Sequence, residues 1–124
     1  MFRSLRLSNQ DERLFSRART AAFSGNHYRV RVGAVLARTG RPLAVESNQA
    51  IEGANSPFKD GHAERRAIAG KPAFKGTLYV ARLALNDELL PSFPCAVCMT
   101  YIQACACVSK IVYFDGHALV KVRL

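Results

Sequence analysis

Two short stretches of this sequence, His62-Ala63-Glu64 and Pro94-Cys95-Ala96-Val97-Cys98, decide how the chain must fold. Together they offer one imidazole and two thiols, a set of ligands that suits a zinc ion. A catalytic zinc site has three protein ligands and leaves the fourth position for water. Glu64 would then lie close to the metal without being needed to bind it. The fold must therefore bring these two stretches together.

The residues around the two stretches predict a strand followed by a helix for each. Residues 43–49 favour a strand, residues 51–61 a glycine-rich loop, and residues 62–69 a short helix that ends at Gly70. Residues 77–81 favour the next strand, and Pro94 fits the first turn of a helix that runs to about Cys105. If the two units lie side by side and parallel, both helix N-termini meet at the carboxyl ends of the strands, where sites in α/β sheets usually lie.

The remaining segments add one helix and three strands. Ser8 can cap a helix whose first turn holds Asp11 and Glu12, and Gly25-Asn26 ends it. Residues 30–37 form a hairpin with residues 43–49. A second hairpin joins residues 110–114 to residues 118–123 through Asp115-Gly116, a strong turn signal. We therefore expect one α/β domain over residues 1–124, in the order helix, two strands, helix, strand, helix, two strands.

Composition excludes several classes of protein. A chain of 124 residues with 49% hydrophobic residues can bury a real core. It holds no run of about 18 apolar residues, so no membrane span is expected. The start of the chain is basic but lacks the apolar stretch of a signal peptide, which favours a cytoplasmic protein. All four cysteines fall within thirteen residues, which favours metal binding over a disulfide scaffold.

A closed structural zinc site is the main alternative to a catalytic one. It would need Cys105 or Cys107 as a fourth ligand, and these lie seven to twelve residues beyond the Cys95/Cys98 pair. At a rise of about 1.5 Å per helical residue they would be roughly 10 Å or more from the metal. We therefore expect Cys105 and Cys107 to be small buried apolar side chains.

The net charge of +9 is concentrated in the first third of the chain. Residues 1–41 hold nine arginines and only two carboxylates. This suits a polyanionic partner such as single-stranded DNA or RNA, although a solvated basic face is the alternative. Thirteen of the eighteen basic residues are arginine, which favours contacts with phosphate. The candidate contacts are Arg13 and Arg17 on the first helix, and Arg29 and Arg31 on the first strand.

Over about residues 8–124 the chain resembles the cytidine deaminase-like superfamily, in its branch of CMP/dCMP and tRNA adenosine deaminases. His-x-Glu followed by Pro-Cys-x-x-Cys is the signature of zinc-dependent base deaminases. The resemblance extends to Val32-Gly33-Ala34-Val35-Leu36, Asn48 and Thr77-Leu78-Tyr79-Val80. It implies a three-layer α/β/α fold, here with a central mixed sheet of five strands and an antiparallel C-terminal hairpin.

The resemblance also implies the parts of an active site. One Zn²⁺ per chain would be held by His62, Cys95 and Cys98, with Glu64 as the proton shuttle. Asn48 and the backbone of Ala63 and Phe93 would contact the substrate. Two aromatic residues are further candidates for the pocket: Phe58, in the loop before His62, and Phe114, at the end of a strand.

Two departures from the family leave the substrate open. About thirteen residues separate the third predicted strand from the cysteine motif, where relatives pass almost directly, and this segment, about residues 82–93, is expected to form an extra wall or lid. The end of the chain is more like the free-cytidine deaminases and the deaminase toxins than the tRNA and APOBEC types.

Several functions are compatible with these residues. The leading hypothesis is conversion of cytosine to uracil, slightly favoured on single-stranded nucleic acid because of the basic first third. A free nucleotide (dCMP or CMP) or cytidine is the alternative substrate. Adenine in RNA and a non-catalytic nucleic-acid-binding module with structural zinc are less favoured, and a homo-oligomer is possible.

Overall fold

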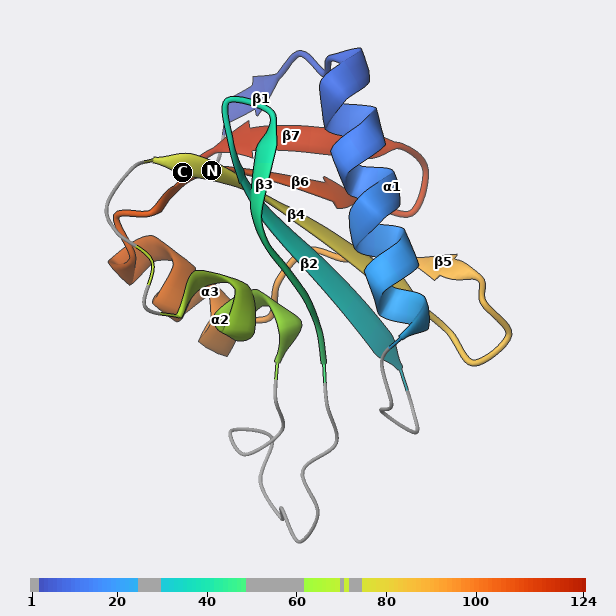
Figure 1. Ribbon diagram of the computed structural model, residues 1–124. Coiled ribbons are helices and arrows are strands. Elements are labelled where there is room, and N and C mark those ends of the chain that lie inside the picture. Colours follow the sequence, from blue (N-terminus) through green and yellow to red (C-terminus); the bar gives the residue numbers. More distant parts are fainter. Residues whose placement is uncertain (1–2, 25–29, 49–61, 70, 72–74) are drawn as a thin grey trace, which may run out of the picture.

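One mixed sheet forms the middle of the molecule in the computed structural model, which describes residues 3–24, 30–48, 62–69, 71 and 75–124 (Figure 1). The described strands follow the order β1-β7-β6-β4-β2-β3, and β5 pairs with the end of β4. The strands are β1 (Arg3–Leu5), β2 (Arg31–Arg38), β3 (Arg41–Ser47), β4 (Gly76–Leu83), β5 (Leu89–Leu90), β6 (Val108–Phe114) and β7 (Leu119–Arg123). The helices are α1 (Asn9–Phe23), α2 (Ala63–Ile68) and α3 (Ala96–Ala104).

Strand directions bring the N-termini of α2 and α3 together. Strand β2 is antiparallel to both β3 and β4, so β3 and β4 point the same way. Strand β4 is parallel to β6. Helix α2 follows β3 and helix α3 follows β4, so both helices begin at the same end of the sheet. The predicted common direction of the two strand–helix units is therefore confirmed, but their strands are not side by side, because β2 lies between β3 and β4.

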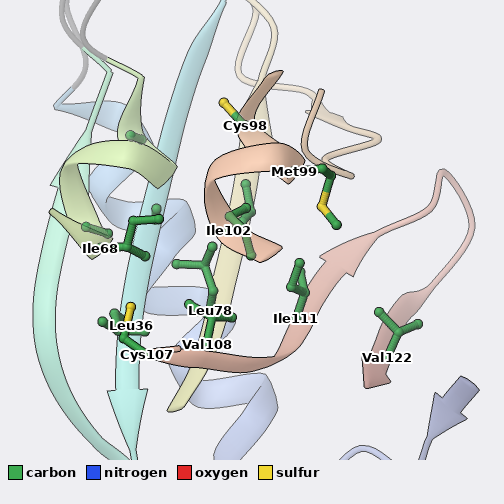
Figure 2. Close-up of a cluster of buried hydrophobic side chains, with 14 residues drawn as sticks. Leu36, Ile68, Leu78, Cys98, Met99, Ile102, Cys107, Val108, Ile111 and Val122 are labelled. Atoms are coloured by element: carbon green, nitrogen blue, oxygen red, sulfur yellow. The ribbon is translucent and has the colours of Figure 1, made fainter. Parts of the chain in front are cut away.

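The sheet separates two layers of helix, as the resemblance implied. Helix α1 covers one face, and α2 and α3 cover the other (Figure 1). Alternate side chains of β2 and β4 serve the two layers: Leu36 and Leu78 pack with α2 and α3, whereas Val35 and Tyr79 pack with α1. Figure 2 shows Leu36 and Leu78 beside Ile68 of α2 and Ile102 of α3. Period-two alternation of buried residues is what a strand covered on both faces requires.

Helix α1 is fixed closely against the sheet. Ser8 and Asp11 form a reciprocal capping box at its start, and Ser24 caps its end. Where α1 crosses β2, a Cβ atom on Gly33 would lie 1.9 Å from the carbonyl oxygen of Ala18. Only glycine allows this approach of the two backbones. Gly33 therefore sets the distance between α1 and the sheet.

The two predicted hairpins are present. Thr39 and Gly40 both have positive φ in the turn between β2 and β3, which is the geometry of a type I′ turn. Strands β6 and β7 pair antiparallel, from Lys110 opposite Arg123 to Phe114 opposite Leu119.

None of the helices in the described ranges is long and apolar enough to cross a membrane.

Two sequence-based predictions need correction. The sheet has seven strands in the described residues rather than five, because β1 pairs with β7 and β5 pairs with β4. These strands hold three and two residues, too few to show a period-two pattern. Cys105 and Cys107 form a disulfide at the end of α3 and were expected to be unpaired. Cys107 is fully buried, as predicted, and Cys105 is half-buried.

Candidate metal centre

The three predicted metal ligands lie at the adjoining starts of two helices. His62 is the N-cap residue of α2 and Cys95 is the N-cap residue of α3, both with extended backbone. Neither side chain makes a capping hydrogen bond to its own helix. Cys98 follows one turn into α3, on the same face as Cys95. The order of strands and helices therefore places an imidazole and two thiols at one point.

The distances between these side chains suit a tetrahedral zinc ion. One ligand atom each from His62, Cys95 and Cys98 lies within 4.8 Å of the other two, and Cys98 Sγ is 3.4 Å from His62 Nδ1. Zinc bonds of about 2.0–2.3 Å to nitrogen and sulfur require ligand atoms roughly 3.5–3.8 Å apart in a tetrahedron. Among the described residues this is the one such group of potential ligands. Small side-chain movements would close it around a metal.

The chemistry of Cys98 also fits a bound cation. Its side chain is fully buried, and burial raises the pKa of the thiol, as does the carboxylate of Glu64 beside it. A buried thiolate without a positive partner is costly. A metal ion supplies that charge, and a coordinating thiol is deprotonated outright. The donor set and its surroundings therefore fit Zn²⁺.

Glu64 lies in the first turn of α2 with only 7% of its surface exposed. Burial raises the pKa of its carboxyl group above the ordinary value. A hydrogen bond from its own backbone amide and the charges of His62 and Arg82 offset this effect only in part. A carboxyl group that is buried, incompletely compensated and next to a metal site is suited to accept and return protons.

A pocket of about 230 Å³ opens beside these residues. Its wall includes His62, Glu64 and Cys95, together with Asn48 and Phe93, which were predicted to contact substrate. It is completed by Val30, Val32, Val80, Arg82 and Ser92. The pocket is therefore apolar on one side and carries a few convergent polar groups, as small-molecule sites usually do.

Comparison with known families identifies the arrangement. The model of the cytidine and deoxycytidylate deaminase zinc-binding region matches residues 8–115, which include all three ligands and Glu64. The chain belongs to this deaminase family. Neither the curated proteins nor the solved structures yielded a match. Membership of the family, together with the ligand group, supports one Zn²⁺ and zinc-dependent deamination in general.

Asn48 serves the fold of this deaminase as well as the wall of its pocket. Its side-chain oxygen accepts from the amide of Val32 at 2.8 Å, and its side-chain nitrogen donates to the carbonyl of Val30 at 3.0 Å. The side chain thus extends the β3 edge against β2 just where the strand ends. One amide hydrogen and further acceptor capacity remain. A contact with substrate stays a prediction.

The segment between β4 and α3 supplies residues that the sequence did not single out. Ser92 is buried; its hydroxyl donates to the carbonyl of Val80 at 2.7 Å and accepts from the amide of Phe114 at 2.9 Å. Ser92 therefore ties this segment across β4 and β6, next to the pocket. The segment was expected to add a wall, but nothing in the sequence distinguished Ser92, or Arg82 near the end of β4.

The other predicted substrate contacts are distributed differently. Phe93 is 43% exposed and packs edge-to-face on Tyr113, with ring centroids 4.9 Å apart. Phe114 does not line the pocket and packs instead with the cluster under α1, on the other face of the sheet. The side chain of Ala63 is buried under α2, and the predicted contact through its backbone stays a prediction. Phe58 lies outside the described residues.

The predicted nucleic-acid contacts that the structure describes do not line the pocket. Arg13 and Arg17 are exposed on α1, which covers the face of the sheet opposite α2 and α3 (Figure 1). Arg31 pairs with Asp87, donates to the carbonyl of Ala84 at 2.9 Å and lies over the ring of Phe23. Its guanidinium thus joins β2 to the turn after β4. Arg29 lies outside the described residues.

Proposed function

We propose that this protein deaminates cytosine to uracil and that its substrate is a small nucleotide. The observation that carries the proposal is a single pocket that joins the metal ligands, a buried carboxyl group and one arginine. Water replaces the exocyclic amine of the base, and ammonia leaves. Adenine remains the competing base, because the chain resembles tRNA adenosine deaminases as well as CMP/dCMP deaminases.

Each residue of the pocket has a distinct part in the proposed reaction. Zinc held by His62, Cys95 and Cys98 would lower the pKa of a water molecule toward about 7. Glu64 would take one proton from the attacking water and give it to the ring nitrogen; it would then take the second proton from the new hydroxyl group and give it to the amine, which leaves as ammonia when the C–N bond breaks. Its raised pKa favours this exchange, since a proton is accepted and released most readily near the working pH. Phe93, exposed at the wall, offers a face on which a base can stack.

The size and charge of the pocket favour a nucleotide. Its volume of about 230 Å³ is small even among ligand pockets and suits one base with its sugar. Arg82 is the one arginine in its wall, and in the described residues its guanidinium has no hydrogen-bond partner. An arginine fork matches the oxygens of a phosphate group. Arg82 is therefore the proposed contact for a 5′-phosphate.

Single-stranded nucleic acid is the second candidate, favoured by the net charge of +9. The arginines that suggested it do not support a track into the pocket: Arg13 and Arg17 lie on the opposite layer, and Arg31 is paired within the fold. A polynucleotide substrate also predicts a steep fall of affinity with salt, because each neutralised phosphate releases counterions. Salt dependence therefore separates the two candidates.

The substrate is tested by assaying purified zinc-loaded protein with dCMP, cytidine, and single-stranded DNA and RNA, scored for uracil and for inosine. We expect uracil from dCMP. Arg82→Gln should raise KM for dCMP by about tenfold, the cost of one charge-assisted contact, and leave cytidine unaffected. Arg19→Gln, on the exposed face of α1, is the matched control. Equal losses on dCMP and cytidine would remove Arg82 from phosphate recognition, and turnover of oligonucleotides alone would favour the second candidate.

The metal site is tested by measuring zinc content. Cys95→Ala and Cys98→Ala should each abolish stoichiometric zinc, because two protein ligands are too few for a stable site. Cys105→Ala is the control and should retain zinc, since Cys105 is paired with Cys107 outside the ligand group. Loss of zinc from the Cys105 variant and not from the Cys95 variant would overturn the assignment.

A further inference from the structure

A second cavity, of about 280 Å³, lies at the end of β4 that is remote from the metal ligands. The first residues of β4, including Thr77 and Tyr79, line this cavity, whereas Val80 and Arg82 line the metal pocket. The cavity is also bordered by the start of α1 and by the turn between β2 and β3. The two cavities thus lie along one strand and share no lining residue.

Positive side chains dominate this cavity. Arg38, Lys75, Lys110 and Lys121 line it, against one carboxylate, Asp11. We call it the lysine cavity. Its cations come from four separate segments of the chain, namely the end of β2, the residue before β4, and strands β6 and β7. Such convergence brings like charges together, which costs free energy unless an anion offsets it.

The single carboxylate offsets only one of the four cations, because it is paired with Lys121. Asp11 accepts from the hydroxyl of Tyr79 at 2.7 Å, from the amide of Ser8 at 2.9 Å and from the ammonium of Lys121 at 2.9 Å. Asp11 thereby holds Lys121 in place at the wall. In the described part of the chain, the ammonium groups of Lys75 and Lys110 have no carboxylate partner. An excess of positive charge therefore remains.

We propose that the lysine cavity binds the phosphate group of a small anion. Lysine ammonium groups act as point charges for phosphate, and the start of α1 adds the positive end of its helix dipole. The volume of about 280 Å³ is large enough for one or two phosphate groups.

The lining favours a small anion over a nucleic acid strand. Proteins that hold single strands stack bases on exposed aromatic rings. The one aromatic residue in this lining, Tyr79, is 3% exposed and its hydroxyl is used by Asp11. The cavity thus offers charge for phosphate but no face for a base. Inorganic phosphate and a phosphorylated metabolite share this chemistry, and inorganic phosphate and pyrophosphate are the probes that test it.

Calorimetric titration of the zinc-loaded protein with inorganic phosphate and pyrophosphate at low salt tests the proposal. We expect pyrophosphate to bind more tightly than phosphate. The double variant Lys75→Gln/Lys110→Gln should raise the Kd for pyrophosphate by about tenfold or more, because two charge-assisted contacts are lost. The matched double variant Arg19→Gln/Lys71→Gln removes the same charge from outside the cavity and should change the Kd by less than about twofold.

Two further measurements keep the result unambiguous. Glu64→Gln should bind pyrophosphate as the wild type does, so the outcome does not depend on whether the protein is a deaminase. Thermal unfolding of each variant without ligand shows whether it is folded, and a pyrophosphate-dependent rise in Tm should be lost only in the lysine variant. Equal weakening in both double variants, or binding of oligonucleotides but not of pyrophosphate, would overturn the proposal.

Discussion

Two buried carboxyl groups, Asp11 under α1 and Glu64 under α2, lie on opposite faces of one sheet and are held in opposite ways. Asp11 is 3% exposed and Glu64 is 7% exposed. Burial raises the pKa of both, but hydrogen bonds from Lys121, Ser8 and Tyr79 overcome it for Asp11 and bring its pKa below the ordinary value. For Glu64 burial prevails, and its pKa is raised.

The difference separates a structural carboxylate from a chemical one. A buried carboxylate that accepts three hydrogen bonds, one of them from a lysine ammonium group, is stabilised in its ionised form. A buried carboxyl group left with little compensation can change protonation readily, and perturbed groups of this kind gather at functional sites. The α1 layer thus keeps its carboxylate fixed, and the α2/α3 layer keeps its carboxyl group exchangeable.

Glu64→Gln should give the largest effect of the series, a loss of turnover without a loss of stability. We expect turnover of dCMP to fall by about 10²–10⁴-fold, since proton transfer is needed at each stage. The free energy of unfolding should stay unchanged or increase, because the amide removes a poorly compensated buried charge. Zinc content and denaturant unfolding of the variant supply the controls. Substantial turnover in the zinc-loaded variant would show that Glu64 is not the proton shuttle.

Asp11→Asn should show the reverse pattern. We expect the free energy of unfolding at pH 7 to fall by about 1–3 kcal/mol, because Lys121 is left half-buried without its charge partner. The turnover of folded protein should be retained, since Asp11 lies outside the metal pocket. Glu12→Gln, exposed in the same turn of α1, is the control and should leave the stability unchanged.

The cost of Asp11→Asn should depend on pH in a defined direction. The folded pKa of Asp11 lies below its unfolded value of about 3.9, so the stabilisation is complete above that pH and is lost as the pH falls through the folded pKa. Urea titrations between pH 7 and pH 3 should therefore show wild type and variant converging below about pH 4. A gap that widened on acidification would mean that Asp11 is not the stabilising anion.

Tyr79→Phe should give the smallest effect of the series. It removes one of the donors to Asp11, a hydrogen bond of 2.7 Å, and leaves the ring in place. We expect a loss of about 1 kcal/mol in the free energy of unfolding. If the loss of unfolding free energy equals that of Asp11→Asn, then the hydroxyl of Tyr79, rather than the ammonium group of Lys121, supplies most of the stabilisation of Asp11.

The meeting of the three candidate metal ligands could be predicted from sequence because their positions follow from local rules. Pro94 marks the start of α3, the spacing of Cys95 and Cys98 puts both on one helix face, and the alternation of β2 and β4 fixes the layers. The role of Asp11 could not be predicted from the sequence, because a carboxylate three residues after a serine cap is normally at the surface. Its burial depends on Lys121, which lies at the other end of the chain.

The missed residues share this dependence on distant contacts. Ser92 gains its position through bonds to β4 and β6, and Arg82 lies in β4 where this strand pairs with β5. Strands β1 and β5 exist only through pairing with longer strands. The disulfide between Cys105 and Cys107 depends on how the chain leaves α3. A sequence pattern predicts the helix or strand in which it occurs, but it says little about which distant segment that element contacts.

The pairing of β1 with β7 has a consequence for how the molecule is assembled. Arg3 lies opposite Arg123, so the first described strand has as its neighbour the last one. Contacts between residues so far apart carry a high entropic cost of loop closure and slow the folding of the chain. The same late strand brings Lys121 to Asp11. We expect arrival of β7 to complete both the sheet edge and the charge network in one step, so that Asp11, in the first turn of α1, gains its charge partner only when this late strand pairs.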